Sequence, residues 1–203
     1  MIFNTNVGFD VQTKDVKYLE AGIHENVKLV SARIAQSSNG NNFIEFLFDK
    51  NGAKTTHTEY EPKKYGDETD ESLQSKVDGQ VSRIIQILKC FYKKELLNYT
   101  ADSFMSFGGW VVALVNNAPD IKLRVKIVYN DSGFAGLPRY SKYTFIEPMT
   151  VSDSDSKIVK LGIDRFERPV ADKEEPAESA ASVFSTGANT HISQDQPKSD
   201  LPF

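Results

Sequence analysis

The sequence predicts a mainly β domain with a helical insertion, followed by a disordered C-terminal tail. Apolar and polar residues alternate within residues 27–60 and again within residues 121–147, as in half-buried strands. Between these regions, at about residues 70–118, apolar residues recur at spacings of three and four, which is typical of helices. From Pro169 onward, apolar residues become scarce among Ala, Ser, Glu, Pro and Gln. We therefore place the domain at residues 1–168 and the disordered tail at residues 169–203.

The first half of the domain predicts a three-stranded antiparallel meander. Weak alternation at Val7, Phe9 and Val11 indicates an N-terminal strand or arm within residues 1–20. Strands follow at residues 27–34, 43–48 and 53–60, with a polar turn cluster at residues 37–42. Asn51-Gly52 separates the last two strands, and this dipeptide favours a tight hairpin because both central residues of a type I′ turn need positive φ.

The insertion predicts two helices. The first begins near Glu71, with Thr69 or Asp70 as its cap, and its apolar stripe continues to Phe91, so that the helix ends near residue 98. The second runs from about residue 101 to residue 117, with Thr100 as its cap. Glycines 108 and 109 lie inside this second helix, where each costs about 1 kcal/mol relative to alanine.

The second half predicts two more strands. Residues 121–129 show the clearest alternation in the chain, and a further strand extends from Leu137 or Arg139 to Glu147. Residues 157–168 are expected to add a short strand or a terminal helix. Three strands, a helical segment and two strands is the order of a five-stranded OB-like barrel. The insertion is longer than that plan requires, so a different α+β sheet remains the alternative.

Charge is distributed unevenly along the chain. The net charge of 203 residues is −4, and residues 171–203 contain six acidic and two basic residues, so residues 1–170 are neutral overall. This asymmetry indicates an acidic interaction tail. No apolar run is long enough for a membrane span, and the N-terminus lacks the pattern of a secretory signal. Cys90 is the only cysteine, and its apolar neighbours indicate a partly buried structural residue.

Basic and aromatic residues on the strands predict a nucleic-acid-binding face. Lys122, Arg124 and Lys126 alternate on one side of the strand at residues 121–129, although any solvent-facing strand can show this pattern. On an OB-like barrel, bases stack on exposed rings and phosphates follow the basic groups. The predicted nucleic-acid-binding residues are Lys28, Arg33, Phe43, Phe46, Tyr60, Lys63, Lys64, Lys122, Arg124, Lys126, Tyr129, Arg139, Tyr140, Lys142 and Tyr143.

Signals for catalysis are weak. His57 and Glu59 share one strand face, but two ligands without a third make a poor metal site. The sequence contains no phosphate-binding loop, no nucleophile-elbow serine and no paired-cysteine site. We expect no catalytic residue, no metal and no cofactor.

The chain ends in Asp200-Leu201-Pro202-Phe203 after the acidic tail. This ending resembles the C-terminal tip of bacterial-type single-stranded DNA-binding proteins, including divergent phage-encoded members. It departs from the usual tip because a single aspartate directly precedes Leu201 and Lys198 reduces the charge nearby. With this weaker charge, the resemblance implies docking that depends mainly on the ring and carboxylate of Phe203.

The resemblance implies an OB-fold and non-catalytic coating of single-stranded DNA during replication, recombination and repair. It also implies that residues 200–203 recruit replication or recombination proteins, in the cytoplasm of a bacterial or phage-infected cell. A homo-oligomer is compatible with it, and no membrane partner is expected. Two alternatives stay open: an enzyme of nucleic-acid metabolism, such as a nuclease or recombination accessory, and a virion structural or assembly protein with a docking tail.

Overall fold

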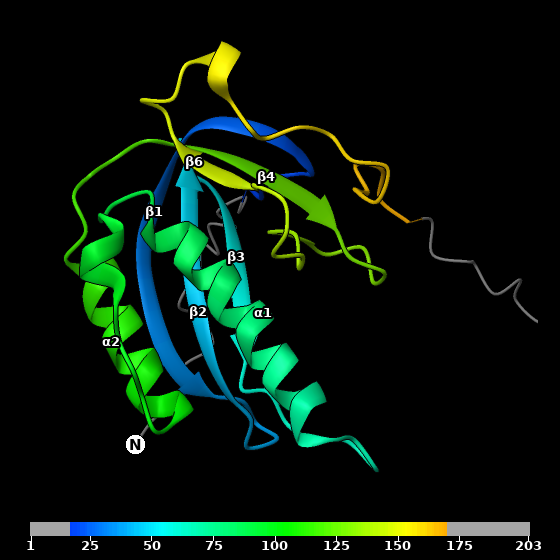
Figure 1. Cartoon of the computed structure of the whole chain (residues 1–203). Helices are drawn as coiled ribbons and strands as arrows, with labels where there is room; N and C mark the ends of the chain where they lie inside the picture. Colours follow the sequence, from blue (N-terminus) through cyan, green and yellow to red (C-terminus); the bar gives the residue numbers. More distant parts are fainter. Residues whose placement is uncertain (1–16, 170–203) are drawn as a thin grey trace, which may run out of the picture. The chain divides into compact units, whose positions relative to one another are not determined.

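The computed structural model describes residues 17–169 (Figure 1). The predicted arm around Val7, Phe9 and Val11 and residues 170–203 of the predicted tail lie outside the described residues. Among residues 17–169 the chain forms six strands and two α-helices, a mainly β architecture as predicted. In chain order the elements are β1 (Gly22–Gln36), β2 (Asn42–Lys50), β3 (Ala53–Tyr60), α1 (Asp70–Leu88), the 3-10 helix η1 (Lys94–Leu97), α2 (Phe104–Asn116), β4 (Leu123–Tyr129), β5 (Ala135–Gly136), β6 (Ile146–Pro148) and the 3-10 helix η2 (Asp153–Asp155).

All strand pairs of the sheet are antiparallel, in the order β3-β2-β1-β4-β5, and β6 also pairs with β4. The predicted meander of β1, β2 and β3 is confirmed. Asn51 and Gly52 join β2 to β3 with φ angles of 53° and 87°, as the hairpin prediction requires. β1 pairs with β2 along its second half and with β4 along its first half, and it bulges between Leu29 and Ser31. The long β1 therefore joins the two halves of the sheet.

Both α-helices cover one face of β1–β3 (Figure 1). Thr69 caps α1 by accepting a hydrogen bond from the Ser72 amide at 3.2 Å, as predicted. α1 ends at Leu88, not near residue 98, and η1 occupies part of the residues that follow. α2 begins at Phe104 with Ser103 as its cap, not Thr100, because the Ser103 hydroxyl accepts from the Ser106 amide at 3.2 Å.

The glycine at position 108 allows α2 to pack closely on the sheet. A Cβ atom on Gly108 would lie 2.3 Å from Ile34 Cδ1 and 3.2 Å from Ile44 Cγ1. Gly109 is exposed, and a Cβ atom there would have no neighbour within 4 Å. The contact between the helix and the sheet thus offsets the helix propensity that Gly108 loses.

β4 is confirmed, but the strand expected within residues 137–147 is largely wrong. Only β5 and β6 pair with β4 here, and residues 137–145 form a loop. Pro138 has no amide hydrogen to donate to a ladder, which favours a break directly after β5. The strand or helix expected at residues 157–168 is also wrong, since these residues are irregular.

The edge of β3 that does not pair with β2 is partly covered by single hydrogen bonds from other segments. The Lys54 carbonyl accepts from the Leu19 amide at 3.0 Å, and the Tyr60 carbonyl accepts from the Gln80 side chain at 2.8 Å. β5 lies beside β3, where the Thr55 hydroxyl donates to the Ala135 carbonyl at 3.3 Å. Within residues 17–169, no backbone ladder joins β5 to β3. Neither of the two α-helices described there combines the length and the apolar character that a membrane crossing needs.

Candidate nucleic-acid interface

The face of β1–β3 opposite the helices carries Arg33, Phe43 and Tyr60, and Arg139 lies at the edge of β3, where α1 also contacts its backbone. We call these four residues the aromatic row. In β2, Ile44, Phe46 and Phe48 point into the core, so Phe43 points to the other face. Phe43 and Tyr60 are cross-strand partners, with ring centroids 5.6 Å apart. Tyr60 is 47% exposed, so its ring is accessible from solvent.

Basic groups lie at both ends of the aromatic row. The Arg33 guanidinium lies over the Phe43 ring, 5.8 Å from the centroid, and pairs with Glu45 at 2.7 Å. Arg139 reaches the opposite edge, where its guanidinium donates to the Thr58 carbonyl at 3.5 Å. Strands are about 4.8 Å apart, so the row spans roughly 14 Å across the three strands and the edge of β3. The structure thus places together four of the predicted nucleic-acid-binding residues: Arg33, Phe43, Tyr60 and Arg139.

Two predicted lysines lie close to this row in the chain. Lys63 is exposed and donates to the Asn41 side chain at 2.7 Å, which links the loop after β3 to the turn between β1 and β2. Lys64 is exposed and pairs with Asp70 at the start of α1. To bind a phosphate, Lys63 has to give up only its hydrogen bond to the neutral side chain of Asn41, whereas Lys64 has to break its ion pair with Asp70.

The basic face expected on β4 is wrong for Arg124 and Lys126, because both side chains are buried. The alternation itself is correct, but every residue from Leu123 to Ile127 is buried. Residues 153–164 cover the side of β4 that the sequence suggested was open. Lys122 alone of the three remains exposed.

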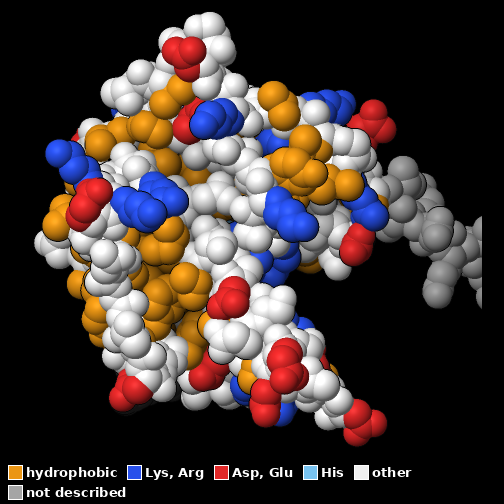
Figure 2. Space-filling view, viewed as in Figure 1, with side chains coloured by type: hydrophobic (Ala, Val, Ile, Leu, Met, Phe, Trp, Pro, Cys, Tyr) orange, Lys and Arg blue, Asp and Glu red, His pale blue; other side chains and the backbone are white. Residues whose placement is uncertain are grey.

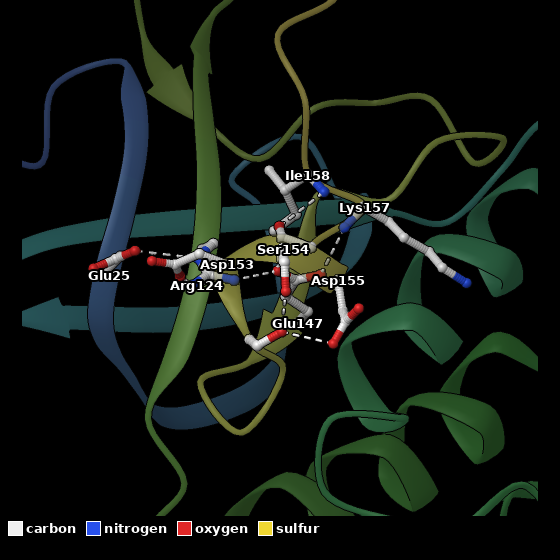
Figure 3. A network of polar contacts seen from close by, with 10 residues as sticks. Glu25, Arg124, Glu147, Asp153, Ser154, Asp155, Lys157 and Ile158 are labelled. Carbon is white, nitrogen blue, oxygen red and sulfur yellow. Dashed lines mark hydrogen bonds and ion pairs between the residues drawn. The ribbon is translucent and has the colours of Figure 1, made fainter.

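Arg124 is held by a carboxylate network (Figure 3). It donates to Glu147 at 2.6 Å and to Glu25 at 3.3 Å, and it also pairs with Asp153. Ser156 and the Lys157 amide donate to the same Glu147 carboxylate. Arg124 therefore joins β4, β6 and the residues after β6, and a phosphate could reach it only after this network opened.

Lys126 lies in a second buried centre. Its ammonium group donates to Asp164 and to the Tyr140 hydroxyl, each at 2.8 Å, and to the Val159 carbonyl. Burial alone would raise the pKa of Asp164, but hydrogen bonds from Lys126, the Leu161 amide and Tyr140 outweigh it and lower that pKa. Burial and the hydrogen bond to Asp164 raise the pKa of Tyr140. This centre is a structural ion pair.

Of the other predicted residues, some are buried or paired elsewhere and two are exposed on a loop. Phe46 and Tyr129 are buried, so the prediction that they contact nucleic acid is wrong for this conformation, and Lys28 pairs with Asp120 at 2.7 Å. Lys142 and Tyr143 are exposed on the loop between β5 and β6. The predicted docking residues Asp200, Leu201, Pro202 and Phe203 lie outside the described residues.

His57 and Glu59 do lie together, with His57 Nε2 2.9 Å from Glu59 Oε1. Arg83 of α1 donates to both oxygens of Glu59, at 2.6 and 2.8 Å, and Gln80 donates at 3.2 Å. Burial alone would raise the pKa of Glu59, but the hydrogen bonds from Arg83 and His57 hold it well below its usual range. Arg83 thereby fixes α1 to β3. The only sign of this role in the sequence is that Arg83 lies off the apolar stripe of the first predicted helix.

Residues 17–169 contain no group of three or more His, Cys, Asp or Glu side chains that could hold a metal ion. Cys90 is buried, and its thiol lies 3.6 Å from the Gln86 carbonyl, which confirms the structural interpretation. Burial raises the pKa of Cys90 to about 12. The thiol is therefore protonated at neutral pH.

No protein-family model matches this sequence, and no curated protein matches it either.

Proposed function

We propose that this protein binds single-stranded DNA without catalysis and largely without regard to sequence, during replication or recombination. The observation that carries the proposal is the aromatic row, in which two neighbouring rings lie between the cationic group of Arg33 on the sheet face and that of Arg139 at the edge of β3. Every base has a π face, so rings and cations together bind single strands of any sequence.

We also propose that the sheet is an OB-like barrel. The order β3-β2-β1-β4-β5, with β5 beside β3, is the cyclic strand order of that fold. Strands β2 and β3 form the usual binding face of an OB-fold, and they carry Phe43 and Tyr60 here. The proposed fold and the proposed site therefore support each other.

Binding requires a small rearrangement of charge. The Arg33 guanidinium already has a carboxylate partner in Glu45, and the pair is exposed on the Arg33 side. Exposed ion pairs are weak and are screened by salt, so a phosphate can replace Glu45. Stacking of one base on an aromatic ring contributes about 1–3 kcal/mol, so Tyr60 and Phe43 supply the part of the affinity that salt does not screen.

The acidic tail supplies the partner-recruiting part of the proposal. By its resemblance to the single-stranded DNA-binding proteins, the tip at residues 200–203 docks replication or recombination enzymes while the domain holds DNA. Phe203→Ala should then abolish capture of such enzymes and leave DNA affinity unchanged. Deletion of residues 171–203 should preserve or tighten DNA binding, because it removes net negative charge from the chain.

The test is a titration of fluorescent poly-dT with the full chain at several salt concentrations, with double-stranded DNA as competitor. We expect binding at nanomolar to micromolar concentrations, little dependence on sequence, and an affinity that falls steeply with salt. Loss of the oligonucleotide in the presence of divalent metal would favour a nuclease instead. Failure to bind any single strand would favour a structural or assembly protein and would refute the proposal.

A further inference from the structure

Residues 157–168, which we call the strap, are irregular in backbone but fixed to the domain. The Arg165 carbonyl accepts from the Tyr129 amide of β4 at 2.9 Å. Lys126 donates to the Val159 carbonyl and to Asp164, whose side chain is fully buried. The strap therefore presents its outward side chains in a defined arrangement even though it forms no strand or helix.

The outward side of the strap has a surplus of positive charge. The strap contains four basic residues and two acidic ones, and the acidic residue Asp164 is already neutralised by the buried Lys126. Arg165 pairs with Asp131, and Arg168 lies 3.5 Å from Glu20. The ion pairs found within residues 17–169 include neither Lys157 nor Lys160.

Rings accompany these cations. The Lys160 ammonium lies 5.2 Å from the centroid of the Phe166 ring. Tyr143 is 49% exposed and packs edge-on against Tyr140, with centroids 5.5 Å apart. The Tyr140 hydroxyl donates to Asp164 at 3.0 Å, so the loop that carries Lys142 and Tyr143 lies beside the strap.

The space-filling view is consistent with this arrangement. Figure 2 shows Lys and Arg side chains next to hydrophobic ones at the upper right, where Figure 1 places the strap and β4. The exposed aliphatic side chains of Val159 and Ile163 add apolar surface to the same segment.

We propose that Lys142, Tyr143, Lys160 and Phe166 form a second subsite for the same single-stranded DNA, which only longer oligonucleotides reach. This inference rests on the proposed function and adds a second contact region to it. Arg139 of the aromatic row and Lys142 belong to one loop, and α1 holds this loop by two hydrogen bonds. Arg83 donates to the Arg139 carbonyl, and Gln86 donates to the Ser141 carbonyl. Single-stranded DNA that passes Arg139 at the edge of β3 would therefore meet Lys142 next, three residues further along a loop that α1 holds in place.

The experiment compares oligo-dT of about 4 and about 16 nucleotides, which bracket the site sizes of single OB-folds. Full-length wild type, K142A/K160A and the control K93A/K94A are titrated by fluorescence anisotropy at several salt concentrations. All four lysines are exposed, and each double variant removes two positive charges. Thermal unfolding followed by circular dichroism checks that all variants are folded.

We expect K142A/K160A to bind the short oligonucleotide like wild type. For the long oligonucleotide its salt slope should fall by about 1.4, because each phosphate contact on a single strand contributes about 0.7. K93A/K94A should leave the slope for both lengths unchanged. Ultraviolet cross-linking of the long oligonucleotide should label a peptide that contains Tyr143 or Phe166.

A wild-type slope and affinity for K142A/K160A on the long oligonucleotide, without cross-linking to residues 140–168, would overturn the second subsite alone. The proposed function would then stand, provided that wild type binds and that a variant of the aromatic row does not. If wild type binds neither oligonucleotide, both proposals fail together. Equal losses in K142A/K160A and K93A/K94A would show a non-specific effect of charge and would also overturn the subsite.

Discussion

Replacing Lys126 with alanine should destabilise the domain strongly, and this prediction separates a structural lysine from a binding lysine. Lys126 is 0% exposed and donates to Asp164, Tyr140 and the Val159 carbonyl. Alanine removes the only cation that contacts Asp164 among residues 17–169. The Leu161 amide and the Tyr140 hydroxyl would remain as donors to a buried carboxylate.

The size of the effect follows from this geometry. Removing one partner of a buried ion pair costs about 3–5 kcal/mol, out of a typical total stability of about 5–15 kcal/mol. For a chain of this size, each kcal/mol lowers Tm by about 2–4 °C. Lys126→Ala should therefore lower Tm by roughly 6–20 °C.

The assay is urea unfolding followed by circular dichroism at pH 7, with Lys122→Ala as the matched control. Lys122 directly precedes β4 and is exposed, so its replacement should change the unfolding free energy by less than about 0.5 kcal/mol. The double variant Lys126→Met/Asp164→Asn should recover more than half of the loss, because it removes both buried charges. If Lys126→Ala is as stable as Lys122→Ala, Lys126 is not part of a buried ion pair. The original prediction that β4 exposes a row of basic side chains would then be favoured.

Three further predictions test the packing and the protonation states of the domain. Gly108→Ala should cost about 1–3 kcal/mol, since its Cβ would lie 2.3 Å from Ile34 Cδ1, whereas Gly109→Ala should add up to about 1 kcal/mol; urea midpoints that shift in the same direction would contradict the packing of α2. The pKa of Glu59 is lowered, so Glu59 stabilises the fold above its unfolded pKa of about 4.3 and this contribution is lost as the pH falls through the folded pKa. Glu59→Gln should thus destabilise at pH 7 and flatten the decline in stability below about pH 4; an unchanged acid limb of the stability profile would refute this. Cys90, with its pKa raised to about 12 by burial, should react with a thiol reagent at pH 8 only at the rate of unfolding, and rapid labelling of the native protein would show that it is accessible.

Local patterns in the sequence predicted much of the fold. Alternation located β1, β2, β3 and β4, and Asn51-Gly52 located the hairpin, because these signals depend on neighbouring residues alone. The strand predicted from Leu137 or Arg139 to Glu147 was largely wrong, because the path of these residues depends on contacts with side chains distant in sequence. Tyr140, for example, leaves the strand pattern to reach Lys126 and Asp164.

The candidate site was predictable where the answer depended on which strand face a residue occupies. Phe43 and Tyr60 share the face opposite the core, as their alternation with Ile44 and Glu59 indicates. Alternation cannot report whether a later segment covers a face, and this is why Arg124 and Lys126 were misplaced. The sequence shows the four basic residues of the strap directly before the acidic tail. It gives no sign that Lys126 of β4 fixes the strap to the domain.

The most direct test of the aromatic row compares Tyr60→Ala with Tyr99→Ala in titrations of poly-dT. The two rings are similarly exposed, at 47% and 44%, but Tyr99 stacks on Trp110 of α2, the helix that covers the other face of the sheet. Loss of one stacking contact should weaken binding by Tyr60→Ala about 5- to 150-fold with an unchanged salt slope, while Tyr99→Ala binds like wild type. Wild-type affinity in Tyr60→Ala, or an equal loss in both variants, would contradict the assignment of the aromatic row as the DNA-binding surface.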